Sequence, residues 1–349
     1  PLWKAAIELE DVQDAKVLLA RAIECIPTNV DMYLALAKLE THANARKVLN
    51  LAREHVPTEH KVWIYAATLE EVNQNLHLVP KIVEKMLFSL EQYQVTLRRE
   101  DWLKEAVDCE RSGAVHTCRE IVRHTAHLQL DEEDVKKTWL DDIQHLLYDA
   151  QPAAVEAARA VVDVAVARFA AKRSVWLQAV LLEQEFGSRG QLEARLQQAV
   201  QAVPHAEVLW LMFAKEMWRR RDIDRARSIL MQAYTHNPQS EQVYLAAVKL
   251  EWESGELART ASLLARAKEV IGSPKIYMKY ALFELEQAHV LSQGGDAAAA
   301  SHRVQHAVSL LQEGLRKFPA FEKLHLMLAQ TQHALLRDVA AARAALQSC

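Results

Sequence analysis

Aromatic residues recur along this chain at a spacing that a single compact domain would not produce. Successive positions are separated by 30 to 39 residues. We call these residues the anchors: Trp3, Tyr33, Trp63, Trp102, Trp139, Trp176, Trp210, Tyr244 and Tyr277. His325 holds the equivalent place near the end of the chain. Self-similarity at such a period is typical of a helical-repeat array, in which each repeat packs mainly against its neighbours.

A second set of residues keeps a constant distance from the anchors. Glutamate stands seven positions after six of them, and we call these the +7 glutamates: Glu10, Glu40, Glu70, Glu183, Glu251 and Glu284. Alanine lies three or four positions after most anchors, as at Ala37 and Ala247. Because residues three, four and seven apart share one face of an α-helix, we expect a helix A in which an aromatic side chain packs beside a small one.

A second helix, helix B, follows with its own signature. Ala45-Arg46 and Ala226-Arg227 open similar segments, and a proline such as Pro57 or Pro238 closes them. Proline cannot continue a helix, so it ends helix B. Two helices in about 34 residues cannot bury their own apolar faces, whereas stacked repeats share one core. The sequence therefore predicts an all-α fold, an α-solenoid of about ten antiparallel helix pairs.

The pattern also predicts how the chain is organised. We expect residues 1–349 to form a single solenoid, and both ends fall within a repeat, so we expect a segment of a longer array. The units between residues 102 and 175 are longer and lack the closing proline, which predicts a less regular stretch. The run Ser292 to Asp296, with two glycines ahead of several alanines, predicts an extended inter-helix loop around 292–300.

Composition argues against several classes of function. The chain has 8 glycines and lacks glycine-rich phosphate-binding loops, Gly-x-Ser-x-Gly and His-Glu-x-x-His motifs. We therefore expect no enzyme activity, no catalytic residues, no cofactor and no small-molecule substrate. A net charge of −4 argues against coating nucleic acid through bulk charge. Apolar runs are too short for a membrane span, so we expect no membrane contact.

Cysteine and histidine residues lie close together only between Cys109 and His127. A structural zinc site needs four ligands at short, regular spacings, whereas Cys109 and Cys118 are nine residues apart and the chain has no Cys-x-x-Cys pair. We therefore expect no metal site.

Taken together, the anchor, the small residue on its face, the +7 glutamate, the Ala-Arg pair and the closing proline resemble the half-a-TPR (HAT) repeat. Proteins of this family are largely components of RNA-processing assemblies. Residues 2–10, 43–50 and 206–212 are most similar to a spliceosomal member of the family. The resemblance implies a non-catalytic nuclear scaffold in pre-mRNA splicing that bridges snRNP components of the tri-snRNP through extended protein–protein contacts. It also implies spliceosomal snRNP proteins as partners, with RNA contact secondary.

Other interpretations stay open at this point. The chain could be a cytosolic TPR-like adaptor that binds peptide tails, although that would need Lys, Asn and Arg residues along one groove. It could also be another HAT protein of RNA processing, acting in 3′-end cleavage or ribosomal RNA maturation. Direct reading of RNA, one base per repeat, requires recurring polar positions, but the recurring positions here are aromatic, small or apolar.

Two groups of charged residues are candidates for specific roles. The +7 glutamates are expected to form ion pairs inside the array, for example Glu40 with Arg46 and Glu251 with Arg259, because an unpaired charge in a helix interface is costly. The densest basic cluster lies at an A–B turn beside Trp218, and arginine beside an aromatic ring suits phosphate or an acidic partner helix. The candidate partner-binding residues there are Arg219, Arg220, Arg221 and Arg225.

Overall fold

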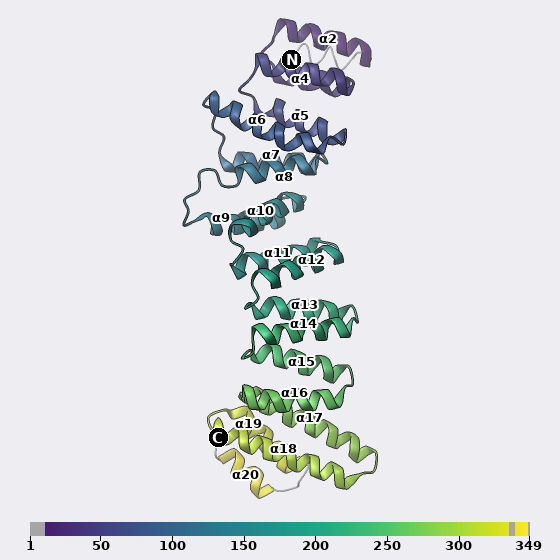
Figure 1. The fold of residues 1–349 in the computed structure, drawn as a ribbon, viewed down its shortest axis with the longest axis vertical. Helices are drawn as coiled ribbons and strands as arrows, with labels where there is room; N and C mark the ends of the chain where they lie inside the picture. The colour runs from purple at the N-terminus through teal and green to yellow at the C-terminus, as the bar shows by residue number, and fades with distance from the viewer. Residues whose placement is uncertain (1–10, 335–338, 348–349) are drawn as a thin grey trace. The chain divides into compact units, whose positions relative to one another are not determined.

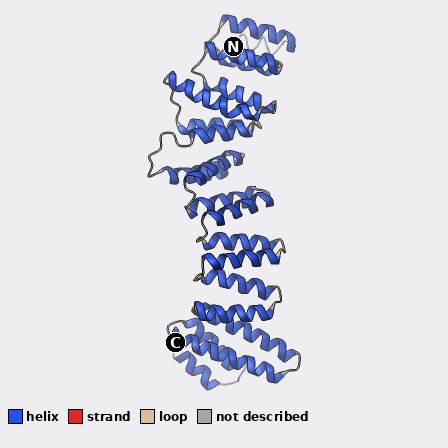
Figure 2. Ribbon diagram, in the orientation of Figure 1, coloured by secondary structure: helices blue, strands red, loops and turns tan. Residues whose placement is uncertain are grey.

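The computed structural model describes residues 11–334 and 339–347, and every regular element in these ranges is helical (Figure 2). The fold is an all-α solenoid of antiparallel helix pairs (Figure 1). The chain divides into two compact units between Ser188 and Arg189, and each unit is described here by itself. The continuity of one solenoid over the whole chain stays a prediction. Trp3 and Glu10 lie outside the described residues.

The first unit contains ten described α-helices and two short helices of other kinds. The α-helices are α2 (Val12–Cys25), α3 (Val30–Leu39), α4 (His42–His55), α5 (His60–Val72), α6 (Val79–Gln92), α7 (Arg99–Arg111), α8 (Val115–Thr125), α9 (Val135–Gln144), α10 (Val155–Arg168) and α11 (Arg173–Phe186). A 3-10 turn, Leu76–Leu78, precedes α6, and a π-helical turn, His145–Asp149, follows α9. The odd-numbered helices from α3 to α11 carry the anchors and are the predicted A helices.

The second unit continues the same alternation. Its helices are α12 (Arg189–Ala202), α13 (Glu207–Arg219), α14 (Ile223–His236), α15 (Glu241–Glu253), α16 (Leu257–Val270), α17 (Pro274–Gln293), α18 (Ala297–Lys317), α19 (Glu322–Ala334) and α20 (Val339–Gln347). None of the helices in the described ranges is both long enough and apolar enough to cross a lipid bilayer.

Local sequence explains most helix boundaries. The side chains of Asn29, Ser240 and Ser273 accept hydrogen bonds from backbone N–H groups in the first turns of α3, α15 and α17, which are donors that a helix leaves unpaired at its start. Several helices B end two residues before a proline, as α4 does before Pro57 and α14 before Pro238. The next helix A then begins after a turn of a few residues.

Helix pairs pack in the same way through most of each unit. Each helix B contacts the following helix A, as α4 contacts α5 and α14 contacts α15, and helices A contact one another across repeats, as α13 contacts α15. Alanine is the residue that lets these helices approach closely, and Ala37, Ala52 and Ala233 have at most 2% of their surface exposed. The core of each unit therefore lies between its A and B helices, as a series of clusters of buried side chains.

Packing changes in the middle of the first unit. There the B helices contact one another, α6 with α8 and α8 with α10, and each helix A contacts the helix B of the next repeat, α5 with α8 and α7 with α10. The connections that lead into α7 and α9 are long, spanning 93–98 and 126–134 (Figure 1). The acidic stretch Asp131 to Asp134 lies in the second of them and is exposed.

The insertion near residue 295 does not form the extended loop that the sequence predicts. Helix α17 continues to Gln293 and α18 begins at Ala297, so a tight turn joins two helices of 20 and 21 residues. Gly295 makes this turn with φ +87°, in the left-handed region that favours glycine. The alanine run that follows is a strong helix former. The extra residues lengthen the helix pair, and the loop around 292–300 was a wrong prediction.

Candidate protein-binding surface

The anchors have a polar function besides their apolar one. At three anchors and at the equivalent His325, a ring nitrogen or hydroxyl donates a hydrogen bond to the carbonyl oxygen six residues earlier, in the turn that follows the preceding helix B. These bonds are Tyr33 to Pro27 (3.2 Å), Trp176 to Ala170 (2.7 Å), Trp210 to Pro204 (2.8 Å) and His325 to Pro319 (2.8 Å). Because Phe lacks such a donor, the bond accounts for a series of Trp, Tyr and His residues at these positions.

The remaining anchors are buried and make other hydrogen bonds or ring contacts, and Trp63 Nε1 is buried without a hydrogen-bond partner. Trp139 donates from Nε1 to the carbonyl oxygen of Ala126 at 2.7 Å, and the Tyr277 hydroxyl lies 2.9 Å from Glu313 Oε1. Trp102 packs edge-on against His60 with ring centroids 5.6 Å apart, and Tyr244 against Tyr234 at 4.5 Å. Trp63 lies beneath the guanidinium of Arg53, which is 4.5 Å from the ring centroid. All the anchors in the described ranges have 9% or less of their surface exposed.

The +7 glutamates join one repeat to the previous one. In each of four described cases the partner is a basic residue of the preceding helix B, 24 positions earlier. The pairs are Lys16–Glu40 (3.7 Å), Arg46–Glu70 (3.1 Å), Arg159–Glu183 (2.9 Å) and Arg227–Glu251 (2.7 Å). The expected pairs Glu40–Arg46 and Glu251–Arg259 placed the partner in the same repeat. Those pairings were wrong, because the +7 side chain points back towards the earlier repeat.

Burial makes these ion pairs strong. Glu251 is 6% exposed and accepts two hydrogen bonds of 2.7 Å from Arg227, a paired geometry that raises the pKa of Arg227 above its usual range. Glu183 likewise raises the pKa of Arg159 by hydrogen bonding. A carboxylate buried in this way would be costly without its cation, so each of these pairs favours the observed packing of helix A against the preceding helix B.

Glu284 shows what happens when the basic partner is missing. The position 24 residues earlier is Thr260, which is fully buried and bonds its own helix at Glu256. Glu284 turns instead to Arg303 of α18, at 2.8 Å, and to His306, at 3.4 Å. The pair therefore forms within one repeat at the lengthened α17–α18 hairpin.

Sequence reasoning missed a second set of glutamates, which we call the +8 glutamates because they stand eight positions after an anchor. Glu71 accepts hydrogen bonds of 2.7 Å from the backbone N–H groups of His116 and Thr117 and from the Thr117 hydroxyl. Glu110 accepts two of 2.9 Å from the N–H groups at Glu156 and Ala157. A carboxylate at a helix N-terminus satisfies free donors and opposes the positive end of the helix dipole. The spacing of eight residues from Trp63 to Glu71 and from Trp102 to Glu110 was the sequence pattern that could have identified this set.

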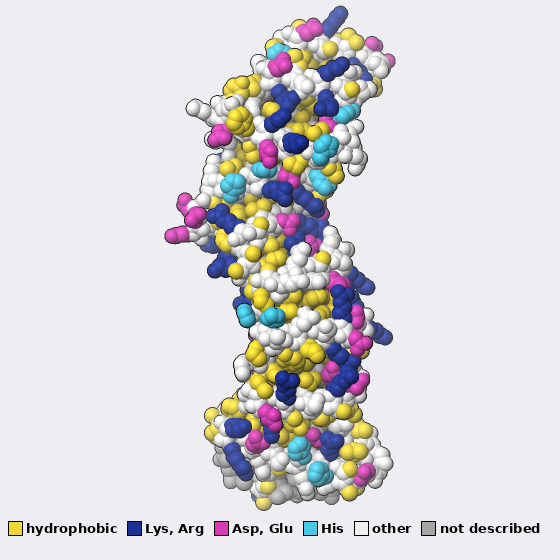
Figure 3. Space-filling view, viewed as in Figure 1, with side chains coloured by type: hydrophobic (Ala, Val, Ile, Leu, Met, Phe, Trp, Pro, Cys, Tyr) yellow, Lys and Arg dark blue, Asp and Glu magenta, His cyan; other side chains and the backbone are white. Residues whose placement is uncertain are grey.

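The predicted arginine cluster is divided between internal and exposed residues. Arg220 and Arg225 both bind Glu193 of α12, and Arg220 also contacts Glu216 at 3.0 Å. Arg219 keeps 64% of its side chain exposed with a long 3.9 Å contact to Glu216. Figure 3 shows this interleaving of basic and acidic side chains along the edge of the second unit near α13–α15.

Arg221 is exposed and occupies a distinctive turn position. Its φ is +64°, and it lies eleven residues after its anchor, where other repeats place Gly113 and Gly255 with φ of +86° and +79°. The left-handed conformation directs the Arg221 backbone into the turn, where its N–H donates to the carbonyl of Trp218 at 2.8 Å. Arg219 and Arg221 are therefore the members of the cluster that are mostly available to a partner.

Cysteine chemistry contributes little here. Cys109 and Cys118 are buried, and burial raises the pKa of both thiols, that of Cys109 to about 12. A protonated, buried thiol is a poor nucleophile and a poor metal ligand. Among the described residues, no group of three or more His, Cys, Asp or Glu side chains is placed to hold a metal ion.

Comparison with known proteins adds sequence relatives. The chain is 43% identical over 109 residues to human pre-mRNA-processing factor 6, which covers 31% of this chain and 11% of that protein. It is 39% identical over 169 residues to pre-mRNA-splicing factor prp1 of Schizosaccharomyces pombe, which covers 48% of this chain and 18% of that one. Over these segments the chain is similar to pre-mRNA-processing factor 6, in agreement with the resemblance of its repeats to the HAT repeat.

The similarity covers only part of each relative. The matched segments span about a tenth to a fifth of the length of these two relatives, and no protein-family model matches the chain. Solved structures that resemble it include a thermophilic TPR protein of Thermus thermophilus, with a TM-score of 0.34, 16% identity and coverage of 56% of this chain and 98% of that one. A human IFIT1 dimer with PPP-AAAA has a TM-score of 0.35 at 16% identity, covering 96% and 71%. At these TM-scores neither supports an inference about this chain.

Proposed function

We propose that this chain is part of a non-catalytic nuclear scaffold in pre-mRNA splicing, which bridges snRNP components of the tri-snRNP through extended protein contacts. The observation that carries the proposal is the sequence similarity to human and fission-yeast proteins named for pre-mRNA processing and splicing. The chain is also 43% identical over 70 residues to Protein STABILIZED1 of Arabidopsis thaliana. Spliceosomal snRNP proteins are the partners that this proposal names.

The geometry supports a mechanical role. Buried ion pairs such as Arg159–Glu183 and Arg227–Glu251 connect successive repeats within each unit, so the helices of a unit keep their spacing. A scaffold that holds two bound modules at a set distance raises their effective concentration for each other without any new contact between them. A protein that holds two partners at a set distance needs such rigidity, whereas a flexible linker does not.

Affinity purification from nuclear extract tests the proposal. The tagged chain should recover snRNP proteins, and it should still recover them after digestion with ribonuclease, because the contacts are between proteins. The matched control is the tag alone in the same extract. Recovery of chaperones without snRNP proteins would contradict the proposal and favour the adaptor interpretation. Loss of every snRNP protein after ribonuclease would show that RNA, and not this surface, makes the link.

The arginine turn is the part of the surface that we propose for partner contact, with Arg219 and Arg221 as the contacting residues. Since Arg220 is used to bind Glu193 and Glu216, it offers a control in the same turn. The double variant Arg219→Ala, Arg221→Ala should weaken recovery of one or more snRNP proteins while leaving the melting temperature unchanged. Equal recovery by the wild type and the double variant would remove this turn from the interface.

RNA contact at the same turn is measured separately. Binding of an RNA oligonucleotide, titrated with salt, should differ little between the wild type and the Arg219→Ala, Arg221→Ala variant if the turn recognises protein. A reduced salt dependence in the variant would show that these arginines neutralise phosphates, and would assign the turn to RNA.

A further inference from the structure

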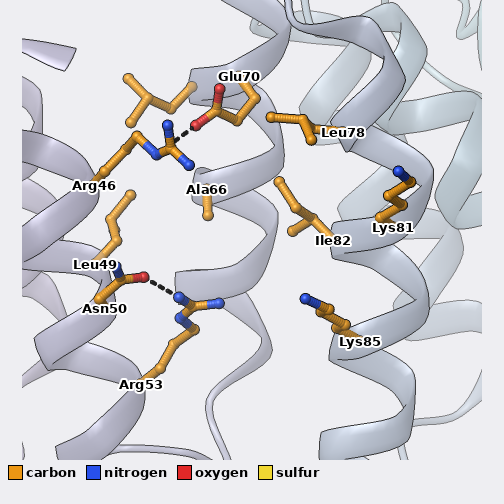
Figure 4. A pocket seen from close by; sticks show the side chains of 11 residues that line it. Arg46, Leu49, Asn50, Arg53, Ala66, Glu70, Leu78, Lys81, Ile82 and Lys85 are labelled. Atoms are coloured by element: carbon orange, nitrogen blue, oxygen red, sulfur yellow. Dashed lines mark hydrogen bonds and ion pairs between the residues drawn. The ribbon is translucent and has the colours of Figure 1, made fainter. Parts of the chain in front are cut away.

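A cavity of about 290 Å³ lies over helix α5, between helices α4 and α6 of the first unit. Basic side chains form its two walls. Arg46 and Arg53 come from α4. Lys81 and Lys85 come from α6, where they are one helical turn apart, and Figure 4 shows the two pairs on either side of α5. The only acidic residue among those that line the cavity is Glu70.

The charge of Glu70 is already neutralised. Glu70 is 3% exposed, accepts hydrogen bonds from Asn75 Nδ2 at 2.7 Å and from His42 Nε2 at 3.3 Å, and forms an ion pair with Arg46 at 3.1 Å. Arg46 reaches this carboxylate with its Nε atom while 54% of its side chain stays exposed. Arg46 therefore balances the charge of Glu70 while its exposed side chain still lines the cavity.

The other three cations are less well paired. Arg53 stacks on Trp63, its Nε is buried without a hydrogen-bond partner, and its one hydrogen bond from the guanidinium goes to the neutral Asn50. Burial lowers the pKa of Arg53, although nearby Glu54 opposes that effect. Within the described part of the chain, neither Lys81 nor Lys85 takes part in an ion pair, and Figure 4 shows both near the cavity. The cavity thus has an excess of positive charge.

Apolar side chains complete the lining. Leu49, Ala66, Leu69, Leu78 and Ile82 lie between the two basic walls. A ligand that matches both features carries carboxylates on either side of an apolar side chain, as an acidic segment of a protein does. Proteins that bind single-stranded nucleic acid combine a basic groove with aromatic rings on which the bases stack, and none of the lining residues is aromatic.

We propose that this cavity binds an acidic, apolar-containing segment of a partner protein. Carboxylates of the segment pair with Arg46 and Arg53 on one wall and with Lys81 and Lys85 on the other, and an apolar side chain contacts Leu49 and Ile82. The volume accommodates side chains of an extended or helical segment and not a folded domain. The proposal depends on the chemistry of the cavity alone, so it stands or falls independently of the assembly to which the chain belongs.

Fluorescence anisotropy with a labelled synthetic peptide of alternating Glu and Leu residues tests the proposal on the whole chain. The matched peptide has Gln in place of every Glu. We expect saturable binding of the acidic peptide that weakens as salt is raised, and at least about tenfold weaker binding of the neutral one. Equal binding of the two peptides, or no binding of the acidic one, would overturn the proposal.

Variants of the basic residues test whether the acidic peptide binds at the cavity. Lys81→Glu with Lys85→Glu should weaken binding of the acidic peptide about tenfold or more, and Arg53→Gln should weaken it separately. The control is Lys172→Glu with Lys215→Glu, which changes the net charge equally at two exposed lysines outside the cavity. If the control variant loses as much affinity as the test variant, the effect is long-range and the cavity is not the site.

An RNA oligonucleotide of similar length is the competing ligand. It should displace the acidic peptide poorly, since the lining offers no ring for a base to stack on. Displacement at concentrations below those of unlabelled peptide, together with loss of RNA binding in the Lys81→Glu, Lys85→Glu variant, would reassign the cavity to nucleic acid. Circular dichroism melting of each variant distinguishes altered binding from altered folding.

Discussion

The segment α5–α10 and the segment α13–α16 contain the same kinds of helix but join them differently. In α13–α16 a short turn leads from each helix B to the next helix A, and the two helices contact each other. In α5–α10 the connections 93–98 and 126–134 are longer, and the B helices contact one another instead. The carboxylates differ accordingly: Glu251 binds an arginine side chain, whereas Glu71 and Glu110 bind the start of a helix.

The difference indicates that the length of the connection between a helix B and the next helix A determines which polar contact the glutamate of helix A makes. A short turn places the +7 position against the previous helix B, where a long basic side chain can reach it. A longer connection brings the helix B of the next repeat to the +8 position, where its free N–H groups need an acceptor. Glu70 and Glu71 are adjacent in sequence and belong to the two different arrangements, the first contacting α4 and the second α8. Helix α5 is the point where one arrangement gives way to the other.

Anchor truncation should have the largest effect in both segments. Trp139 is 1% exposed and Trp210 is 3% exposed, so either change to alanine removes a large buried side chain and should cost about 3–5 kcal/mol. The corresponding change to phenylalanine removes the indole hydrogen bond and part of the ring system, and should cost less, about 1–3 kcal/mol. Denaturant unfolding followed by circular dichroism measures both. An unchanged unfolding midpoint for Trp210→Ala would show that the ring is not part of the core.

Removing a +8 carboxylate should have a smaller, more local effect. Glu71→Gln keeps the shape of the side chain but loses the charge that faces the start of α8, and should cost about 1.5–3 kcal/mol. Hydrogen exchange should accelerate at His116 and Thr117, whose N–H groups donate to Glu71. The control is Glu91→Gln on the exposed face of α6. Equal exchange in the two variants would mean that Glu71 does not hold α8.

The smallest predicted effect is a dependence on pH. A hydrogen bond from His60 Nε2, at 3.1 Å, lowers the pKa of Glu105 below its ordinary value of 4.5, against the opposing effect of burial. Because the folded pKa is lower than the unfolded one, the stabilisation is fully present above 4.5 and is lost as the pH falls through the folded value. The stability advantage of the wild type over Glu105→Gln should therefore shrink between about pH 5 and pH 3. Urea unfolding at several pH values would show it, and a constant difference would argue against it.

Much of this fold could be predicted because its causes are local. The 3.6-residue period, the anchors and the closing prolines predict the A and B helices, and Pro57 and Pro238 do end their helices. The partner of a +7 glutamate could not be predicted, because sequence proximity favours Arg46 for Glu40 while packing supplies Lys16. The +8 glutamates share their distance from Trp63 and Trp102, but the helix that each contacts depends on a change in helix packing that the spacing alone does not predict. The cavity over α5 joins residues of three helices, so only the tertiary structure brings Arg53 and Lys85 together.

The central claim is that the described +7 glutamates other than Glu284 join their repeat to the previous one through a basic residue 24 positions earlier. A double-mutant cycle on Arg227→Met and Glu251→Gln measures this pair most directly, by comparing the free energies of unfolding of the two single variants, the double variant and the wild type. We predict a coupling energy of about 1–3 kcal/mol. Single-variant effects that simply add in the double variant would mean that the two side chains do not stabilise the contact between α14 and α15, and would contradict the claim.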